Sequence, residues 1–238
     1  MNSILLYEGA SPCGHQDIIV VATSVTNSSN NDKTGDMIQV YILLKDVHPL
    51  EAIKLGLDVA ICGNCPYRND LCYVNVAFAA CMIWKSYQKG NIPSVTKEQA
   101  VTLFKFRGVP IRWGAYGDPG MYDYELIKFI TDACGMGHTS YTHQWMEPWF
   151  DERHLEYSMA SVDHENTVEK LRAIHPNARY YRVAKDYSDL AKDEIACPSS
   201  GDDRVMGKGS PRKVTCNKCL LCSGTSKSAK NVVIIEND

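Results

Sequence analysis

The chain has 238 residues, of which 45% are hydrophobic and 22% are charged, an ordinary composition for one large or two small globular domains. This composition excludes disordered, collagen-like and coiled-coil proteins. No stretch approaches the roughly 18 consecutive apolar residues of a membrane span, and the first residues lack the basic and apolar regions of a signal peptide, so we expect a cytoplasmic protein without membrane contact. The net charge of −3 means that a nucleic-acid partner would need a local basic surface.

The first part of the chain predicts strands and then helices. Runs of β-branched and apolar residues indicate strands at 3–7, 18–25 and 39–44, with a polar loop at 27–36. Helical spacing follows at 50–55, 74–89 and 96–107, and a short apolar run predicts a strand at 58–61.

The middle of the chain alternates strands and helices. Strands are expected at 109–113, 139–143, 158–162 and 179–183, and helices at 123–133, where Asp123 is the cap, and at 165–174. Successive βα units indicate a parallel sheet, so the predicted fold is α/β, a TIM-like (βα) barrel over residues 1–196. Because eight units usually need about 250 residues, an incomplete or irregular barrel is expected. Residues 197–238 predict a small C-terminal segment, packed on the barrel and closed by a strand at 231–235.

Polar residues follow the predicted parallel strands, where α/β proteins place their ligands. They are Asp118 after the first strand, His143 and Gln144 after the second, and Asp163 after the third. Asp163 can also be explained as a helix cap, and Gly117-Asp118-Pro-Gly as a plain turn. The tryptophans and tyrosines nearby suit either stacking of an extruded base or core packing.

The chain holds ten cysteines, and in a reducing cytosol such a number favours metal ligation over disulfides. Three of them stand close together in Cys216-x2-Cys219-x2-Cys222, and Cys197 can supply a fourth thiolate. Four thiolates suit a structural zinc ion, which would order a segment that offers little to bury. A histidine in place of Cys197 is the alternative fourth ligand.

The C-terminal segment is also the basic part of the chain. Between residues 204 and 230 there is no acidic residue, and the predicted DNA-binding residues there are Arg204, Lys208, Arg212, Lys213 and Lys218. Such clustering favours a phosphate backbone as partner, and a solvated basic face is the alternative.

A second group of cysteines, Cys62, Cys65 and Cys72, is a candidate second metal set. Three thiolates could bind a metal or an iron–sulfur cluster, although the spacing differs from that of radical enzymes. Buried cysteines that only pack are the alternative.

Several short motifs resemble, in order, those of small phage proteins of the DpdA type, which are similar to shortened tRNA-guanine transglycosylases that act on DNA. The motifs are Lys33-Thr34-Gly35 ahead of a strand, Cys62-x2-Cys65-Pro with Cys72-Tyr, Arg112-x5-Asp118, Ser161-Val-Asp163, and Cys197-Pro with the three terminal cysteines. The likeness covers most of the chain. The sequence departs from the tRNA enzymes in its all-cysteine zinc pattern and in lacking their glycine-rich catalytic motif.

The resemblance implies replacement of guanine in DNA by a 7-deazaguanine precursor such as preQ0, through a covalent glycosyl enzyme. It implies Asp163 as the nucleophile and Asp118 as the residue that recognises or protonates the base, and these two roles can be exchanged. Expected substrate-binding residues are Lys33, Gly117, His143, Gln144 and Arg182. Zinc would be structural. The Lys-Thr-Gly loop also suits an ordinary hairpin turn.

Two other classes of protein fit the same residues. If Cys62, Cys65 and Cys72 hold an iron–sulfur cluster, the fold could carry redox or radical chemistry. If no residue is catalytic, the chain is a zinc-ribbon DNA-binding protein on a barrel-like scaffold. Metal content and the effect of replacing Asp163 separate these readings.

Overall fold

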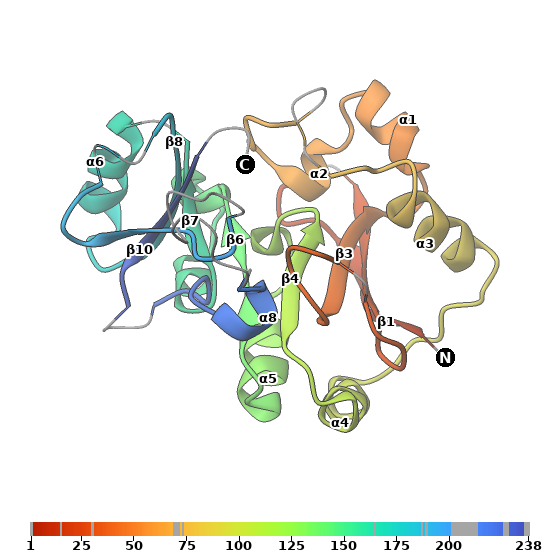
Figure 1. The fold of residues 1–238 in the computed structure, drawn as a ribbon. Helices are drawn as coiled ribbons and strands as arrows, with labels where there is room; N and C mark the ends of the chain where they lie inside the picture. Colours follow the sequence, from red (N-terminus) through yellow and green to blue (C-terminus); the bar gives the residue numbers. More distant parts are fainter. Residues whose placement is uncertain are drawn as a thin grey trace.

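The architecture is that of a computed structural model of the chain. The structure describes residues 2–14, 16–29, 31–68, 72, 74–163, 165–186, 188, 190–200, 214–225 and 229–235. In this part of the chain the protein has two β-sheets with helices packed against them, which confirms the α/β class (Figure 1).

The first sheet lies on the right in Figure 1 and has five strands in the described residues. In spatial order they are β1 (Ser3–Ala10), β2 (Asp17–Thr23), β3 (Ile38–Leu44), β4 (Ile111–Tyr116) and β5 (His138–Thr139). β1, β2 and β3 pair antiparallel, whereas β3, β4 and β5 pair parallel. Nearly every residue of β2 and β3 is buried, as their continuous β-branched runs predict for central strands covered on both faces.

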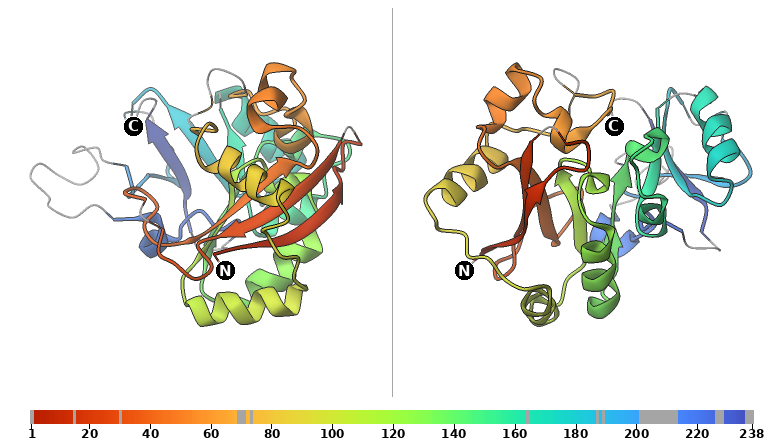
Figure 2. Two further views of the ribbon diagram at one scale, coloured as in Figure 1. Left: turned by 90° about the vertical axis from the view of Figure 1, so that its right-hand side faces the viewer. Right: turned by 180° about the vertical axis from the view of Figure 1, so that it is seen from behind.

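Helices surround the first sheet and bury its faces (Figure 2). They are α1 (Pro49–Lys54), α2 (Val59–Cys62), α3 (Ala79–Gln88), α4 (Lys97–Arg107) and α5 (Tyr124–Cys134). Local signals explain their ends: Thr96 and Gln99 form a capping box at α4, and the Asp123 carboxylate accepts the Glu125 N–H at α5, as predicted.

The strand predicted at 58–61 is wrong, because these residues lie at and in the short helix α2. The backbone N–H groups of Cys62 and Gly63 donate to the carbonyls of Asp58 and Val59. A four-residue apolar run has no period long enough to separate a buried strand from a buried helical turn.

The second sheet lies on the left in Figure 1 and is parallel throughout the described part. Its strand order is β6 (Tyr141–Thr142), β7 (Met159–Val162), β8 (Tyr180–Ala184), β10 (Asn231–Ile235) and β9 (Glu194–Ala196). The helix α6 (Glu165–Ile174) connects β7 to β8. Only Ser140 separates β5 from β6, so the chain passes from one sheet to the other in a single residue.

The sequence predicted a (βα) barrel, but the described residues do not form a closed one. In this part of the chain the strands form two separate sheets, and β1 does not pair with β9, nor β5 with β6. Strands as short as β5 and β6, with two residues each, form too few hydrogen bonds to continue one ladder across the junction.

The C-terminal segment enters the second sheet. Its strand β10 lies between β8 and β9, and its short helix α8 (Cys216–Cys219) lies beside the base of the first sheet (Figure 1). The expected boundary at residue 197 therefore falls between two neighbouring strands, which ties residues 231–235 to the main fold.

The largest core lies around the first sheet, where Trp113, Phe104 and most residues of β2 and β3 are buried. Short 3₁₀ helices in the described residues carry the loops that follow the strands: η2 (Pro119–Met121), η3 (Gln144–Met146) and η4 (Glu152–Glu156). Among the described residues, no helix combines the length and apolar character that a membrane crossing requires.

Candidate functional site

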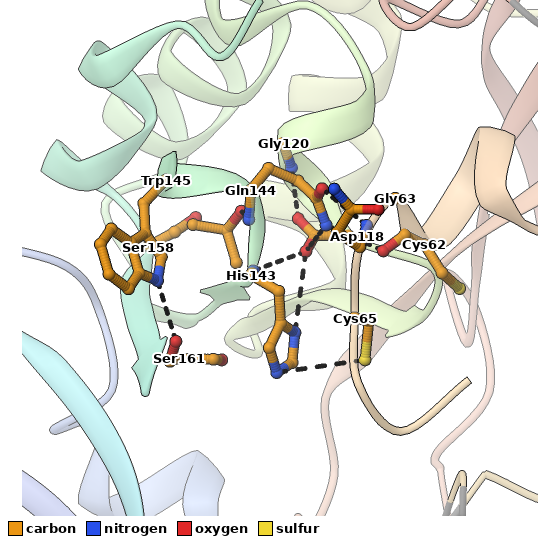
Figure 3. Close-up of polar contacts among 12 residues, drawn as sticks. Cys62, Gly63, Cys65, Asp118, Gly120, His143, Gln144, Trp145, Ser158 and Ser161 are labelled. Carbon is orange, nitrogen blue, oxygen red and sulfur yellow. Dashed lines mark hydrogen bonds and ion pairs between the residues drawn. The ribbon is translucent and has the colours of Figure 1, made fainter. Parts of the chain in front are cut away.

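The candidate site lies where β4, β6 and β7 end, at the junction of the two sheets. Asp118 follows β4, His143 and Gln144 follow β6, and Asp163 follows β7. Parallel strands bring their carboxyl ends to one edge, so these four predicted residues come together although they are separated by up to 45 positions. Figure 3 shows His143, Gln144 and Asp118 meeting the segment that carries Cys62 and Cys65.

Asp118 is the buried centre of this arrangement. One carboxylate oxygen accepts the N–H of Gly120 at 2.8 Å, and the other accepts the N–H of His143 at 2.7 Å and the side-chain amide of Gln144 at 2.8 Å (Figure 3). These bonds join the end of β4 to the end of β6. The turn predicted as the alternative for Asp118 is present, since the residue caps η2, and it is combined with long-range contacts.

Gln144 extends the network to the first cysteine segment. Its Nε2 also donates to the carbonyl of Cys62 at 2.8 Å, and its Oε1 accepts the N–H of Asn64 at 3.2 Å. The side chain is completely buried. A Cβ on Gly63 would stand 1.9 Å from Oε1, so only glycine lets the two segments approach this closely.

Gly117 also serves close packing. Its backbone has φ of +80°, and a Cβ there would stand 2.7 Å from the Cβ of Ile42. Gly117 therefore permits the sharp turn from β4 into Asp118. Its expected role in substrate binding stays a prediction.

His143 connects the two aspartates. Its Nε2 lies 3.5 Å from a carboxylate oxygen of Asp163, and its Nδ1 lies 3.9 Å from Asp118. Burial by itself would lower the pKa of His143, but Asp163 and Cys65 raise it to about 10. The imidazole side chain is 20% exposed and the Asp163 side chain 13%, so both remain within reach of solvent, whereas Asp118 is closed off at 5%.

The first cysteine group lies at the edge of this site. Cys62 ends α2, and the Sγ of Cys65 lies 4.0 Å from the Nε2 of His143. Burial raises the pKa of the thiols of Cys62 and Cys72, and each of these two thiols also feels the charge of Cys65. Cys62 and Cys65 lie at the end of a helix instead of a strand, where the N–H of Cys65 donates to the carbonyl of Cys62, and the second metal site stays a prediction.

Arg68 holds this segment in place, and the sequence analysis missed it. Its guanidinium donates to both carboxylate oxygens of the buried Asp58, at 3.1 and 2.7 Å, and to the carbonyls of Gly63 and Gly56. A bidentate arginine that also binds two carbonyls fixes a loop without regular structure. An arginine ten residues after an aspartate gives no local signal for such a pair.

The second cysteine group lines one small cavity of about 40 Å³ between the two sheets. All four predicted ligands, Cys197, Cys216, Cys219 and Cys222, contribute to its wall. Cys222 is almost fully buried, and burial raises the pKa of its thiol to about 12, although a hydrogen bond with Tyr141 acts in the opposite direction.

The cavity brings the four cysteines into one place without arranging them around a metal. In the part of the chain that the structure describes, no three Cys, His, Asp or Glu side chains are positioned to hold an ion together. The donor set itself suits zinc, because four thiols without competing carboxylates share the cavity.

Lys33 lies at this cavity, away from the strand ends. The carbonyls of Lys33 and Thr34 accept the N–H groups of Cys216 and Asn217. The Lys-Thr-Gly loop thus packs its backbone against α8 and is not a free hairpin turn, while the expected role of Lys33 in substrate binding stays a prediction. The loop connects the first sheet to the C-terminal segment.

Arg182 is engaged elsewhere. Its guanidinium forms a two-point ion pair with Glu194, at 2.9 and 2.8 Å, where both side chains are buried in the second sheet. Glu194 also accepts the hydroxyl of Tyr180. A structural ion pair thus accounts for the charge of Arg182, which was expected to bind substrate.

Most of the predicted DNA-binding residues lie outside the described residues: these are Arg204, Lys208, Arg212 and Lys213. Lys218 is described, and it is exposed in the last turn of α8. It lies between Cys216 and Cys219, which line the cysteine cavity, and the expected DNA contact stays a prediction.

Comparisons with protein families, with curated proteins and with solved structures give no match.

Proposed function

We propose that the protein exchanges guanine in DNA for a 7-deazaguanine base such as preQ0, with Asp163 as the nucleophile. The observation that carries the proposal is the contact of Asp163 with His143 at the carboxyl ends of parallel strands. A partly exposed carboxylate next to an imidazole offers both a nucleophile and a proton donor at one place.

The exchange needs two displacements at C1′ of the deoxyribose. An oxygen of Asp163 forms a bond to C1′ while the bond from C1′ to N9 of guanine breaks, and the leaving nitrogen takes its electron pair and a proton. In the second step N9 of the 7-deazaguanine attacks C1′, releases its proton, and frees the carboxylate. His143 lies where it can give the first proton and accept the second.

Asp118 has a positioning role in this proposal. Because its carboxylate accepts three hydrogen bonds from protein groups, it holds His143 and Gln144 in place and is not available to the base. Asp163 is therefore the better assignment for the nucleophile. The target nucleotide has to leave the duplex to reach this edge, and base extrusion serves the same purpose in other enzymes that modify bases.

The C-terminal segment supplies the DNA contact and a structural zinc site in this proposal. Cys197, Cys216, Cys219 and Cys222 would hold the ion, which would fix the basic residues against the two sheets. The two sheets then act as an open, irregular barrel with the site at their common edge. A cytoplasmic location belongs to the proposal, because all ten cysteines are free and a reducing compartment keeps them so.

The decisive experiment incubates the protein with duplex DNA and labelled guanine or preQ0 and measures label in the polymer. We expect incorporation by the wild type and by Asp46→Asn, which changes an exposed aspartate after β3. We expect loss of incorporation by Asp163→Asn with DNA binding retained. DNA binding by the wild type without any incorporation would favour a non-catalytic binding protein and refute the exchange.

Metal analysis tests the zinc site and the competing iron–sulfur enzyme together. We expect one zinc per chain in the wild type and in Cys81→Ser, whose buried thiol is not among the residues that line the cysteine cavity. Cys222→Ser should lose the zinc. Iron with acid-labile sulfide and a brown colour, lost on replacing Cys65, would instead favour the iron–sulfur enzyme, in which Cys62, Cys65 and Cys72 hold the cluster.

A further inference from the structure

A second cavity, larger than the cysteine cavity, opens on the far side of the Asp118 turn. Its volume is about 230 Å³, and it lies between the end of β1, the loop around η2 and the loop before η4. Its walls are formed by Tyr7, Ala10, Pro12, Gly120, Tyr122, Asp123, Tyr124, Trp149, Asp151 and His154. Asp163, His143 and Gln144 do not line it, and it adjoins the candidate site only through Gly120, whose N–H donates to Asp118.

The lining of this cavity is rich in aromatic side chains, and its only charged side chains are aspartates. Four of the ten lining residues are Tyr or Trp, two are Asp, and none is Lys or Arg. Aromatic faces carry a negative quadrupole, which attracts cations within about 6 Å of the ring centroid. This combination is unfavourable for an anion or for a phosphate.

The two aspartates differ in what they can offer a ligand. Asp151 is already paired with Arg153, whose guanidinium lies 2.7 Å from one of its oxygens. Asp123 is exposed, and its hydrogen bond to the Glu125 N–H at the start of α5 uses one carboxylate oxygen. Asp123 therefore supplies the carboxylate at the mouth of the cavity.

A buried imidazole at the base of the cavity does not oppose a positive ligand. His154 is 2% exposed, and its Nδ1 has no hydrogen-bond partner among the described residues. Burial lowers the pKa of His154, so the ring is neutral at pH 7, although the charges of Asp151, Asp118 and Asp123 act to raise it. Three carboxylates thus contribute negative potential around this imidazole.

The structure already contains a cation packed on this group of rings. The guanidinium of Arg153 lies 4.5 Å from the centroid of Tyr124, on a ring that also lines the cavity. We propose that the cavity is a binding site for an organic cation of the guanidinium or amine type, held between the rings of Tyr7 and Trp149 with its charge towards Asp123. This site is independent of the proposed base exchange.

The experiment titrates the full-length protein with methylguanidinium and follows tryptophan fluorescence, using methylurea as the neutral probe of the same shape. The contribution of Trp149 is isolated by subtracting the signal of Trp149→Phe. We expect saturable quenching by methylguanidinium and none by methylurea. Asp123→Asn should weaken binding about fivefold to tenfold, because asparagine keeps the helix cap and removes only the charge.

Two further variants separate a role in binding from damage to the fold. Tyr7→Leu removes a ring but keeps the apolar contact, and it should weaken methylguanidinium binding by a similar factor. Asp46→Asn, at an exposed aspartate outside the cavity, should bind like the wild type. Equal binding of methylurea, no saturable signal from Trp149, or unchanged affinity in Asp123→Asn would each overturn the proposal.

Discussion

Replacing Asp118 by asparagine tests the network that organises the candidate site. The carboxylate accepts three hydrogen bonds, whereas an amide presents one accepting oxygen and one donating nitrogen. In the least costly orientation, the oxygen of the new asparagine side chain accepts the hydrogen bonds from His143 and Gln144. The NH₂ group of the asparagine then faces the N–H of Gly120. One buried donor loses its acceptor, and two charge-assisted bonds become neutral ones.

The expected loss follows from these three changes. An unsatisfied buried N–H costs about 1–3 kcal/mol, and each hydrogen bond weakens by about 1 kcal/mol when its acceptor loses its charge. Relief from burying a charge offsets part of this sum, which leaves about 2–4 kcal/mol. Rotating the Gln144 amide gives no rescue, because it would break the bonds to Cys62 and Asn64.

Urea unfolding followed by circular dichroism measures the loss for Asp118→Asn. The matched control is Asp123→Asn, a similar change at an exposed aspartate that still caps its helix, and it should cost less than about 0.5 kcal/mol. Equal stability of the two variants would show that the network around Asp118 contributes little, and the positioning role would then be refuted.

Three further predictions concern the supports of the fold and the site. Burial alone would raise the pKa of Glu194, but its bonds with Arg182, the Ala191 N–H and Tyr180 lower it below the usual range. The ionised Glu194 therefore stabilises the fold fully above its unfolded pKa of about 4.3, and this stabilisation is lost as the pH falls through its folded pKa. The melting temperatures of the wild type and of Glu194→Gln should therefore differ at pH 7 and converge in acid. Gly63→Ala should destabilise more than Gly56→Ala, since both have positive φ but only the former meets Gln144, and equal urea midpoints would contradict this. Arg68→Lys keeps the positive charge but cannot form the four hydrogen bonds of the guanidinium, so it should speed proteolytic cleavage near Cys65 several-fold. The control Lys54→Arg in α1 should leave the cleavage rate unchanged.

Local pattern predicted most of the regular elements and much of the candidate site. The strands β1 to β4 and the helices α4, α5 and α6 lie where the β-branched runs, the helical spacing and the caps indicated, whereas the strand expected at 139–143 divides at Ser140 into β5 and β6 of different sheets. The four strand-end residues were found for the same reason, since the edge that receives the ends of parallel strands is a property of the α/β class. The cysteine spacing likewise grouped residues that share a cavity.

Local pattern did not reveal contacts between residues that are far apart in the chain. Arg182 and Lys33 were both expected to bind substrate, and the structure adds that the Arg182 guanidinium pairs with Glu194 and that the Lys33 carbonyl accepts the N–H of Cys216. The pairing of Arg68 with Asp58 gave no sequence signal at all.

By itself, the sequence determined the α/β class, the main strands and helices, and the polar residues at the strand ends. Helices and strands that bury one face space their apolar residues periodically along the chain, and this spacing can be read from neighbouring residues. Only the tertiary structure decided that β10 lies between β8 and β9, that the strands divide into two sheets, and that Asp118 is saturated while Asp163 remains accessible. Those outcomes depend on hydrogen bonds and packing between residues far apart in the chain, which no local period records.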